Sequence, residues 1–151
     1  MSKQESLEYL LKKLNFRDDP PKYIDVNPVS QMATNLREGL IECAANEKDL
    51  YLYALLMHHL KKRTLIFANS ISAVRRLAPF LQNLNVHALA LHSQMPQKAR
   101  LRAIERFTSQ KESVLVATDV AARGLDIPDV QLVVHYNVSF RIYLLRDLFW
   151  S

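Results

Sequence analysis

The stretch from Ser113 to Ile127 constrains the fold of this chain more than any other. It begins with a short apolar run, Val114 to Ala117, which is too brief and too rich in β-branched residues for a helix. Such a run between polar residues is typical of a strand that is buried on both faces, as in a parallel sheet. The run therefore predicts an α/β fold built on a parallel sheet.

Strand-like and helical patterns alternate through the rest of the chain. Further strands are predicted over residues 64–68, 86–91 and 130–136, and shorter extended segments over residues 23–26 and 36–43. Helices are predicted after Asn46 as N-cap through about Leu60, after Ser70 as N-cap, and from Pro96 onward. Pro79 is expected to kink or end the second helix. The alternation predicts a mostly parallel sheet flanked by helices.

Helical spacing also predicts which side of the first of these helices is buried. One face would carry Leu50, Tyr53, Ala54, Met57 and Leu60. The basic triplet at residues 61–63 then falls at the carboxyl end of that helix, where cations suit the helix dipole. This structural role is favoured over a direct contact with nucleic acid.

Polar residues follow each predicted strand of the parallel sheet. They are Asn69-Ser70, His92-Ser93-Gln94, Thr118-Asp119, and His135 with Asn137. The carboxyl ends of parallel strands share one edge of a sheet, and ligands bind beyond that edge. These residues are therefore expected to form one polar rim.

The charge distribution indicates a polyanionic partner. The net charge is +5, with seven Lys/Arg against nine Asp/Glu in residues 1–60 and thirteen against six in residues 61–151. A basic second part favours nucleic acid or nucleotide phosphate as a partner. The single cysteine, Cys43, fits a reducing compartment, and no apolar run approaches the roughly 18 residues of a membrane span.

Phosphate and ribose recognition is the chemistry that suits the rim. His58 and His59 are adjacent and would point to different faces of a helix, so they make a poor pair of metal ligands. The sequence has neither a nucleophile elbow nor a Gly-Lys-Ser/Thr phosphate loop. No catalytic or metal-binding residue is therefore predicted. Thr118 can donate its hydroxyl to a phosphodiester, and Asp126 can accept from ribose hydroxyls. Gly124 is expected at a turn with positive φ or at a close backbone approach.

The string from Thr118 to Asp126 resembles motif V of the DEAD-box RNA helicases, and the resemblance extends over residues 22–138. It implies a RecA-like C-terminal domain, the second lobe of a P-loop NTPase-like pair. In that family the motif V threonine touches RNA and the last aspartate touches the ATP ribose. Asp119 would contact RNA together with that threonine, whereas Arg123 and Gly124 would bind ATP, and Arg123 would help to join the two lobes around it. A salt bridge from Arg123 to Asp119 or Asp126 is the structural alternative.

Two further segments resemble motifs of the same family. Leu65 to Ser70 resembles motif IV, which implies that Asn69 and Ser70 approach RNA and that Phe67 belongs to the core. Gln97 and Arg100 resemble the Gln-x-x-Arg element, which also contacts RNA. On the same predicted helix, Lys98, Arg102 and Arg106 form a row that is expected to face solvent.

The end of the chain departs from the family pattern. Residues 1–21 are predicted to form a helix and a proline-containing linker, residues 22–138 a partial helicase C-terminal domain, and residues 139–151 a divergent apolar tail. The arginine finger of the family is not carried over to Arg141 or Arg146, whose spacing does not fit. The domain is thus expected to be incomplete at its C-terminus. The tail either packs over the exposed sheet edge or results from a shifted reading frame or a truncated gene model.

The resemblance implies a part of an ATP-dependent RNA helicase that acts in ribosome assembly. Its partners would be RNA, ATP, a first RecA-like lobe that holds Mg²⁺, and pre-ribosomal proteins. The resemblance implies a location in the nucleolus of the nucleus, with the cytoplasm as the alternative. The chain alone would be inactive, since it has no phosphate loop, no Asp-Glu magnesium motif and no arginine finger. A non-catalytic RNA- or protein-binding module is the alternative, and a lobe of a DNA helicase is a weaker third reading.

Overall fold

The computed structural model describes residues 23–25, 36–59, 61–125, 127–138 and 141–147. Its strands are β1 (Tyr23–Asp25), β2 (Leu36–Glu42), β3 (Thr64–Ala68), β4 (Ala88–Leu91), β5 (Val114–Thr118), β6 (Leu132–Val138) and β7 (Arg141–Asp147). Its helices are α2 (Lys48–His58), α3 (Ile71–Asn83), α4 (Gln97–Ser109) and α5 (Asp119–Ala122). The helix and linker predicted for residues 1–21 lie outside the described residues.

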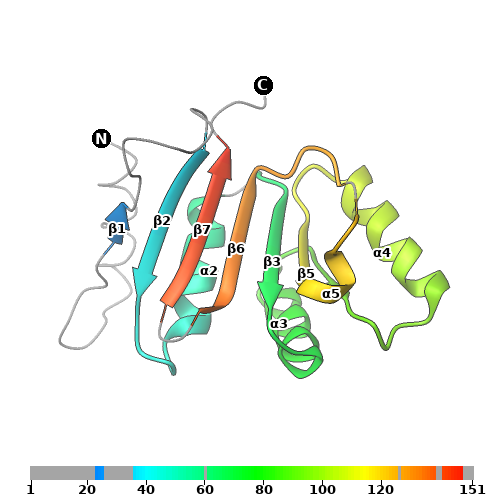
Figure 1. Cartoon of the computed structure of the whole chain (residues 1–151), viewed down its shortest axis with the longest axis horizontal. Coiled ribbons are helices and arrows are strands. Elements are labelled where there is room, and N and C mark those ends of the chain that lie inside the picture. Colours follow the sequence, from blue (N-terminus) through cyan, green and yellow to red (C-terminus); the bar gives the residue numbers. More distant parts are fainter. Residues whose placement is uncertain (1–22, 26–35, 60, 126, 139–140, 148–151) are drawn as a thin grey trace.

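One seven-stranded sheet runs through the described part of the chain in the order β1-β2-β7-β6-β3-β5-β4 (Figure 1). The four strands β6, β3, β5 and β4 are parallel, which confirms the predicted RecA-like sheet. On the other side of β6, β7 and β2 continue the sheet with antiparallel pairing, and β1 completes it. Residues 141–147 therefore extend the sheet edge by backbone pairing.

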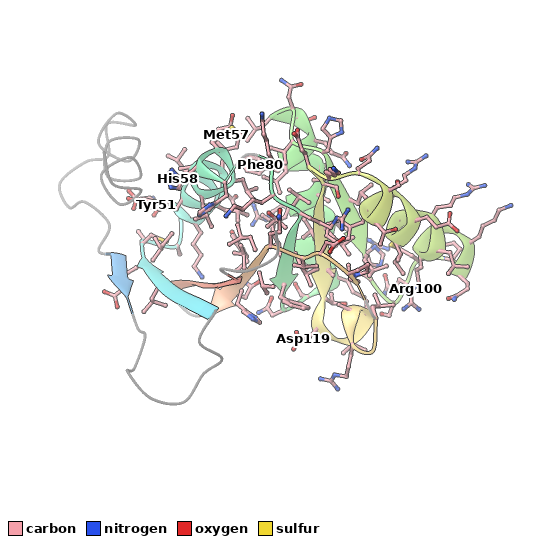
Figure 2. The ribbon with its side chains drawn as sticks, turned by 90° about the horizontal axis from the view of Figure 1, so that it is seen from above. Tyr51, Met57, His58, Phe80, Arg100 and Asp119 are labelled. Carbon is pink, nitrogen blue, oxygen red and sulfur yellow. The ribbon has the colours of Figure 1, made fainter. Side chains whose placement is uncertain are left out.

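Helices cover both faces of the parallel strands. In β3, Ile66 packs with buried residues of α2 and α3 such as Leu55 and Leu77, whereas Leu65 packs with Phe107 of α4. Seen from above, Tyr51 of α2 and Phe80 of α3 lie on one side of the sheet, and Asp119 of α5 lies on the other (Figure 2). Burial on both faces explains why the central strands are continuous apolar runs.

The buried face of α2 differs from the predicted one. Tyr51, Leu52 and Leu55 are almost completely buried, whereas Leu50 is 38% exposed. The helix also begins one residue later than predicted, after Glu47. Residues 50–57 are all apolar, so spacing alone could not select a face.

The other helix signals are confirmed in part. Ser70 caps α3, because its Oγ accepts a hydrogen bond from the backbone N–H of Ala73 at 3.1 Å. Pro79 does not end this helix, which continues to Asn83. Pro79 lies on the exposed side of α3. Proline has no N–H to donate to the carbonyl four residues earlier in the helix, but on this side water can solvate that carbonyl.

Candidate functional site

The strand register brings the predicted polar rim together. Ala68 of β3 is level with Thr118 of β5, and Leu91 of β4 is level with Ala117, so the residues that follow these strands leave the sheet at one edge. This is the lower edge of the sheet in Figure 1. Next to it, the backbone N–H of Asn69 donates a hydrogen bond to Oδ1 of Asn137 at 3.1 Å.

Thr118 ends β5 and precedes α5, so it stands where the chain turns from the sheet toward the rim. Its side chain is 8% exposed and makes no capping hydrogen bond to α5. Ala121 and Ala122 are buried against the α4 side of the core and hold the short helix in place. Asp119, the first residue of α5, is exposed. The turn therefore places a largely buried threonine and an exposed carboxylate at the same edge.

The chain leaves α5 through Arg123 and Gly124, both exposed. Gly124 has φ +76°, which confirms the predicted positive-φ turn. No heavy atom of the described residues lies within 4 Å of a Cβ built there, so the space beside this turn is open. Among the described residues the Arg123 side chain makes no ion pair with Asp119. Asp126 lies outside those residues, so its predicted ribose contact and its pairing with Arg123 stay predictions.

The two residues predicted on α4 lie at its amino-terminal end. Gln97 is the first residue of the helix and is exposed, whereas Arg100 is half-buried. Nε of Arg100 is buried without a hydrogen-bond partner within the described residues. A buried guanidinium N–H without a partner costs free energy, and an anionic oxygen would satisfy it.

His92 adds a second unsatisfied nitrogen to the rim. The residue is 6% exposed, and its Nδ1 has no hydrogen-bond partner in the described part of the chain. Burial, and to a lesser extent the positive charge of Arg75, lowers the pKa of this imidazole. His92 is therefore neutral near pH 7 and offers hydrogen bonding without a charge.

Two motif IV residues have structural roles. Phe67 is half-buried and stacks on His135 of β6, with ring centroids 5.1 Å apart and an interplanar angle of 19°. The Oγ of Ser70 accepts the α3 cap bond and also lies 3.0 Å from the Oγ of Ser72, so it is already engaged within the protein. The sequence predicted this cap, and the cap bond limits the hydrogen bonds that the Ser70 hydroxyl can make to RNA.

The basic triplet was assigned the wrong role at Arg63. α2 ends at His58, and Arg63 turns inward, with its side chain 8% exposed. Its guanidinium donates to the carbonyl oxygens of Thr108 at 2.9 Å and Pro128 at 3.0 Å. Sequence spacing cannot reveal such long-range partners, so the helix-dipole interpretation fails for this residue.

The sequence also gave no signal for a polar cluster on the α2 side of the sheet. Arg76 of α3 pairs with the carboxylate of Asp49 of α2, and the Tyr136 hydroxyl of β6 donates to the same carboxylate. Burial raises the pKa of Asp49, but the hydrogen bonds from Arg76 and Tyr136 and the Arg76 charge outweigh it and leave this pKa lowered. Burial, followed by the bond to Asp49, raises the pKa of Tyr136 to about 12.

No group of three or more His, Cys, Asp or Glu side chains in the described residues could hold a metal ion. No helix among them has the length and apolar character needed to cross a membrane.

Comparisons with known proteins match both the sequence and the fold. The model of the helicase conserved C-terminal domain matches residues 47–147. The ATP-dependent RNA helicase MAK5 of Phaeosphaeria nodorum is 72% identical over 138 residues, which cover 91% of this chain and 17% of that protein. The chain thus spans less than a fifth of the length of this curated relative.

Solved structures of DEAD-box proteins share the fold. The E. coli DEAD-box protein SrmB, bound to regulator of ribonuclease activity A, has a TM-score of 0.59 and 36% identity, covering 64% of this chain and 56% of SrmB. Domain 2 of the Mss116p DEAD-box helicase, bound to an RNA duplex, has a TM-score of 0.54 and 26% identity, covering 63% of this chain and 40% of that one.

The family model covers two thirds of the chain, and the strand ends carry the residues that motifs IV and V require. The chain therefore belongs to the helicase conserved C-terminal domain family, as a RecA-like C-terminal domain of the DEAD-box RNA helicase type.

Proposed function

We propose that this chain serves as the second RecA-like lobe of an ATP-dependent DEAD-box RNA helicase. The observation that carries the proposal is the register of β3 and β5, which sets Thr118 level with Ala68 and so beside Asn69 at the rim. Thr118, Asp119, Asn69, Ser70, Gln97 and Arg100 would contact the RNA backbone. Phosphate contacts of this kind hold a strand without reading its sequence.

ATP would bind between this lobe and a first lobe. Asp126 would accept from the ribose hydroxyls, while Arg123 and the Gly124 turn would face the nucleotide. The first lobe would hold Mg²⁺ and the phosphates, since this chain contains no Gly-Lys-Ser/Thr loop. Closure of the two lobes around ATP would bend one RNA strand and separate a short duplex.

The name of the 72% identical relative supports RNA and ATP as ligands. We also propose a role in ribosome assembly, with pre-ribosomal proteins as partners and the nucleolus as the location. Imaging of the fluorescently tagged chain in cells tests the location, and a signal confined to the cytoplasm would contradict it.

The RNA contact is tested with Thr118→Val, which removes the hydroxyl and keeps the shape of the side chain. One hydrogen bond contributes about 0.5–1.5 kcal/mol, so RNA binding is expected to weaken roughly three- to tenfold. Thr108→Val is the matched control, because the Thr108 hydroxyl bonds only carbonyls of its own helix. Fluorescence anisotropy with a single-stranded oligonucleotide measures both variants. Equal affinities for Thr118→Val and the unmodified chain would refute the contact.

The chain alone is expected to hydrolyse no ATP, with or without RNA. A phosphate-release assay measures this, and clear RNA-stimulated turnover would contradict the assignment of this chain as one lobe of a two-lobe enzyme. Its RNA binding is expected to be weak and strongly dependent on salt.

A further inference from the structure

A row of cations on the outer face of α4 lies outside the rim. Lys98, Arg102 and Arg106 are all exposed, and we refer to them as the α4 strip. Their four-residue spacing places them along one face of the helix, over a length of about 12 Å. Glu105 is the one acidic residue of α4, which carries four basic residues. The strip therefore has a positive charge that its own helix does not neutralise.

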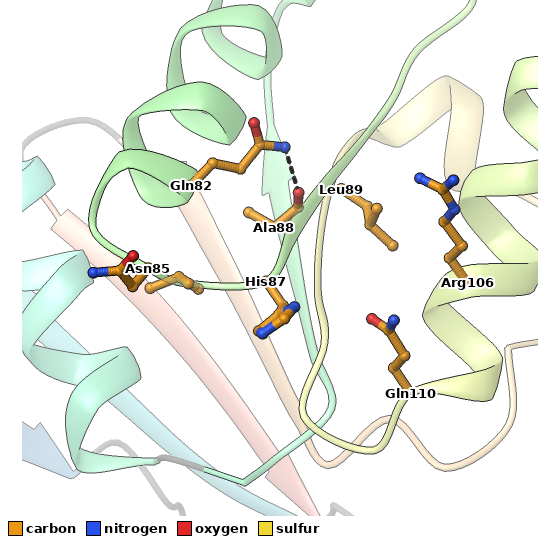
Figure 3. Close-up of a pocket in the computed structure, with 8 residues that line it drawn as sticks. Gln82, Asn85, His87, Ala88, Leu89, Arg106 and Gln110 are labelled. Atoms are coloured by element: carbon orange, nitrogen blue, oxygen red, sulfur yellow. Dashed lines mark hydrogen bonds between the residues drawn. The ribbon is translucent and has the colours of Figure 1, made fainter.

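The strip ends at a hollow of about 450 Å³ between the carboxyl ends of α3 and α4 (Figure 3). Arg106 lines this hollow together with Asn85, His87 and Gln110, and Val86 and Leu89 add half-buried apolar surface. The volume lies within the range of small-molecule sites. Amide and imidazole groups beside apolar side chains suit a planar heterocycle, and a guanidinium suits its phosphate.

An added β-strand is a poor occupant of this hollow, although β4 is the last strand of the sheet. The carbonyl oxygen of Ala88 accepts from Nε2 of Gln82 at 2.7 Å, and the Ala88 N–H donates to the Val86 carbonyl at 2.7 Å. The start of the open strand edge is thus already satisfied. What remains free is side-chain chemistry, which points to a nucleotide more than to an extended peptide.

The hollow and the rim lie at opposite ends of α4. The helix begins with Gln97 near the carboxyl end of β4, where the rim residue His92 follows, and it runs back to Arg106 and Gln110 beside the start of β4. The α4 strip bridges these two ends. An RNA strand that leaves the rim would meet cations along the whole helix before it reaches the hollow.

We propose that single-stranded RNA extends from the rim along the α4 strip and places one nucleotide in the hollow. Arg102 and Arg106 contact its phosphates, and the amides of Asn85 and Gln110 face its base. This inference rests on the proposed function, because the rim must bind RNA for the strand to continue. It adds a second binding segment on a separate face of the domain.

The test compares oligonucleotides of two lengths on the 151-residue chain and on the double variant Arg102→Gln/Arg106→Gln. An oligonucleotide of about five nucleotides covers the rim alone, and one of about fifteen also reaches the strip and hollow. The double variant should bind the long oligonucleotide about tenfold more weakly and the short one unchanged. Its salt slope for the long oligonucleotide should fall by about 1.4, since each lost phosphate contact on a single strand contributes about 0.7.

Lys61→Gln/Lys111→Gln is the control of equal charge, because both lysines are exposed and neither lies on α4 nor lines the hollow. It should leave both affinities within about twofold of the unmodified chain. If the unmodified chain binds neither oligonucleotide, the proposed function itself fails. The extension is overturned if the Arg102/Arg106 variant binds the long oligonucleotide normally or loses equal affinity for both lengths. Selective, strip-dependent binding of a polyglutamate peptide in place of the long RNA would also overturn it.

Discussion

Arg63 has a structural role that follows from its hydrogen-bond partners. Its two terminal nitrogens bridge carbonyl oxygens from the end of α4 and from the segment before β6, at Thr108 and Pro128. A planar guanidinium reaches both acceptors at once, and an ammonium reaches only one. The residue therefore joins two segments that lie far apart in the sequence.

Arg63→Lys should lower the free energy of unfolding by about 1 kcal/mol, because it leaves one partly buried carbonyl oxygen without its donor. Urea denaturation at neutral pH measures this change. Arg102→Lys on the exposed face of α4 is the control and should stay within about 0.5 kcal/mol. An unchanged urea midpoint for Arg63→Lys would show that the bridge contributes nothing.

At the residue scale, sequence reasoning succeeded where the signal was local. Ser70 was recognised as a cap and Gly124 as a positive-φ turn, because each requirement involves only a few neighbouring residues. It failed at Arg63 and Asp49, whose partners are remote in sequence. A charged residue beside a helix end has many possible partners, and only the folded chain selects one.

At the element scale, α2 is joined to α3 and β6 through the shared carboxylate of Asp49. Arg76 and Tyr136 both hydrogen-bond this carboxylate, so three elements meet at one charged group. Lys48 adds a bond from its Nζ to the backbone oxygen of Tyr136 at 3.1 Å. The polar residues at the start of α2 thus fix the rotation of a helix that is otherwise apolar on every side.

This cluster should make the stability of the domain depend on acidity. The pKa of Asp49 is lower in the folded chain than its ordinary value of 3.8, so the folded state binds the proton less readily than the unfolded state. The contribution is therefore complete well above 3.8 and is lost as the pH falls through the folded pKa. The side chains of Asp49 and Arg76 are 30% and 50% exposed, so the contribution of this ion pair to stability should not exceed about 1 kcal/mol.

Asp49→Asn keeps the shape of the side chain and removes its charge, so it isolates the contribution of the ionised carboxylate to stability. The stability difference between the unmodified chain and Asp49→Asn should be larger at pH 7 than at about pH 3, as measured by urea denaturation at both values. Other carboxylates titrate equally in the two proteins and cancel in the difference. A difference that does not change with pH would rule out the charged cluster as its source.

The elements of the parallel sheet were predictable because each strand is a buried apolar run with a polar end. The same reasoning could not orient α2, since its apolar residues surround the helix. It also could not predict the pairing of β7 with β2, because β2 lies about a hundred residues earlier and leaves no local pattern. The ends of β3, β4 and β5 meet at one edge as predicted. His135 and Asn137 lie within β6 and do not follow it, and the antiparallel side emerged only from the structure.

At the scale of the whole molecule, β7 joins two parts of the sheet. It pairs with β2 over seven residue pairs on one side and with β6 on the other. In the described part of the chain, β2 reaches the parallel sheet only through this strand. Residues 141–147, part of the tail that the sequence set apart from the domain, thus form an internal strand of the sheet.

Truncation after residue 139 should release β2 and expose the edge of β6. Hydrogen exchange, followed by mass spectrometry, should show fast exchange in residues 36–42 and retained protection in β3 and β5. The bare edge should also produce concentration-dependent association in light scattering. Truncation after residue 147 keeps β7 and is the control. Unchanged protection of residues 36–42 in the shorter chain would contradict this role.

The position of β7 between β2 and β6 also determines when β2 can find its second partner strand during translation. The ribosome makes β2 before it makes any of the parallel strands, and it makes the matching strand only after all of them. During that interval one side of β2 has no hydrogen-bonding neighbour, while the parallel strands are free to assemble. A nascent polypeptide of this kind must keep β2 unpaired on one side until the ribosome has also made β7, which favours chaperone contact with β2.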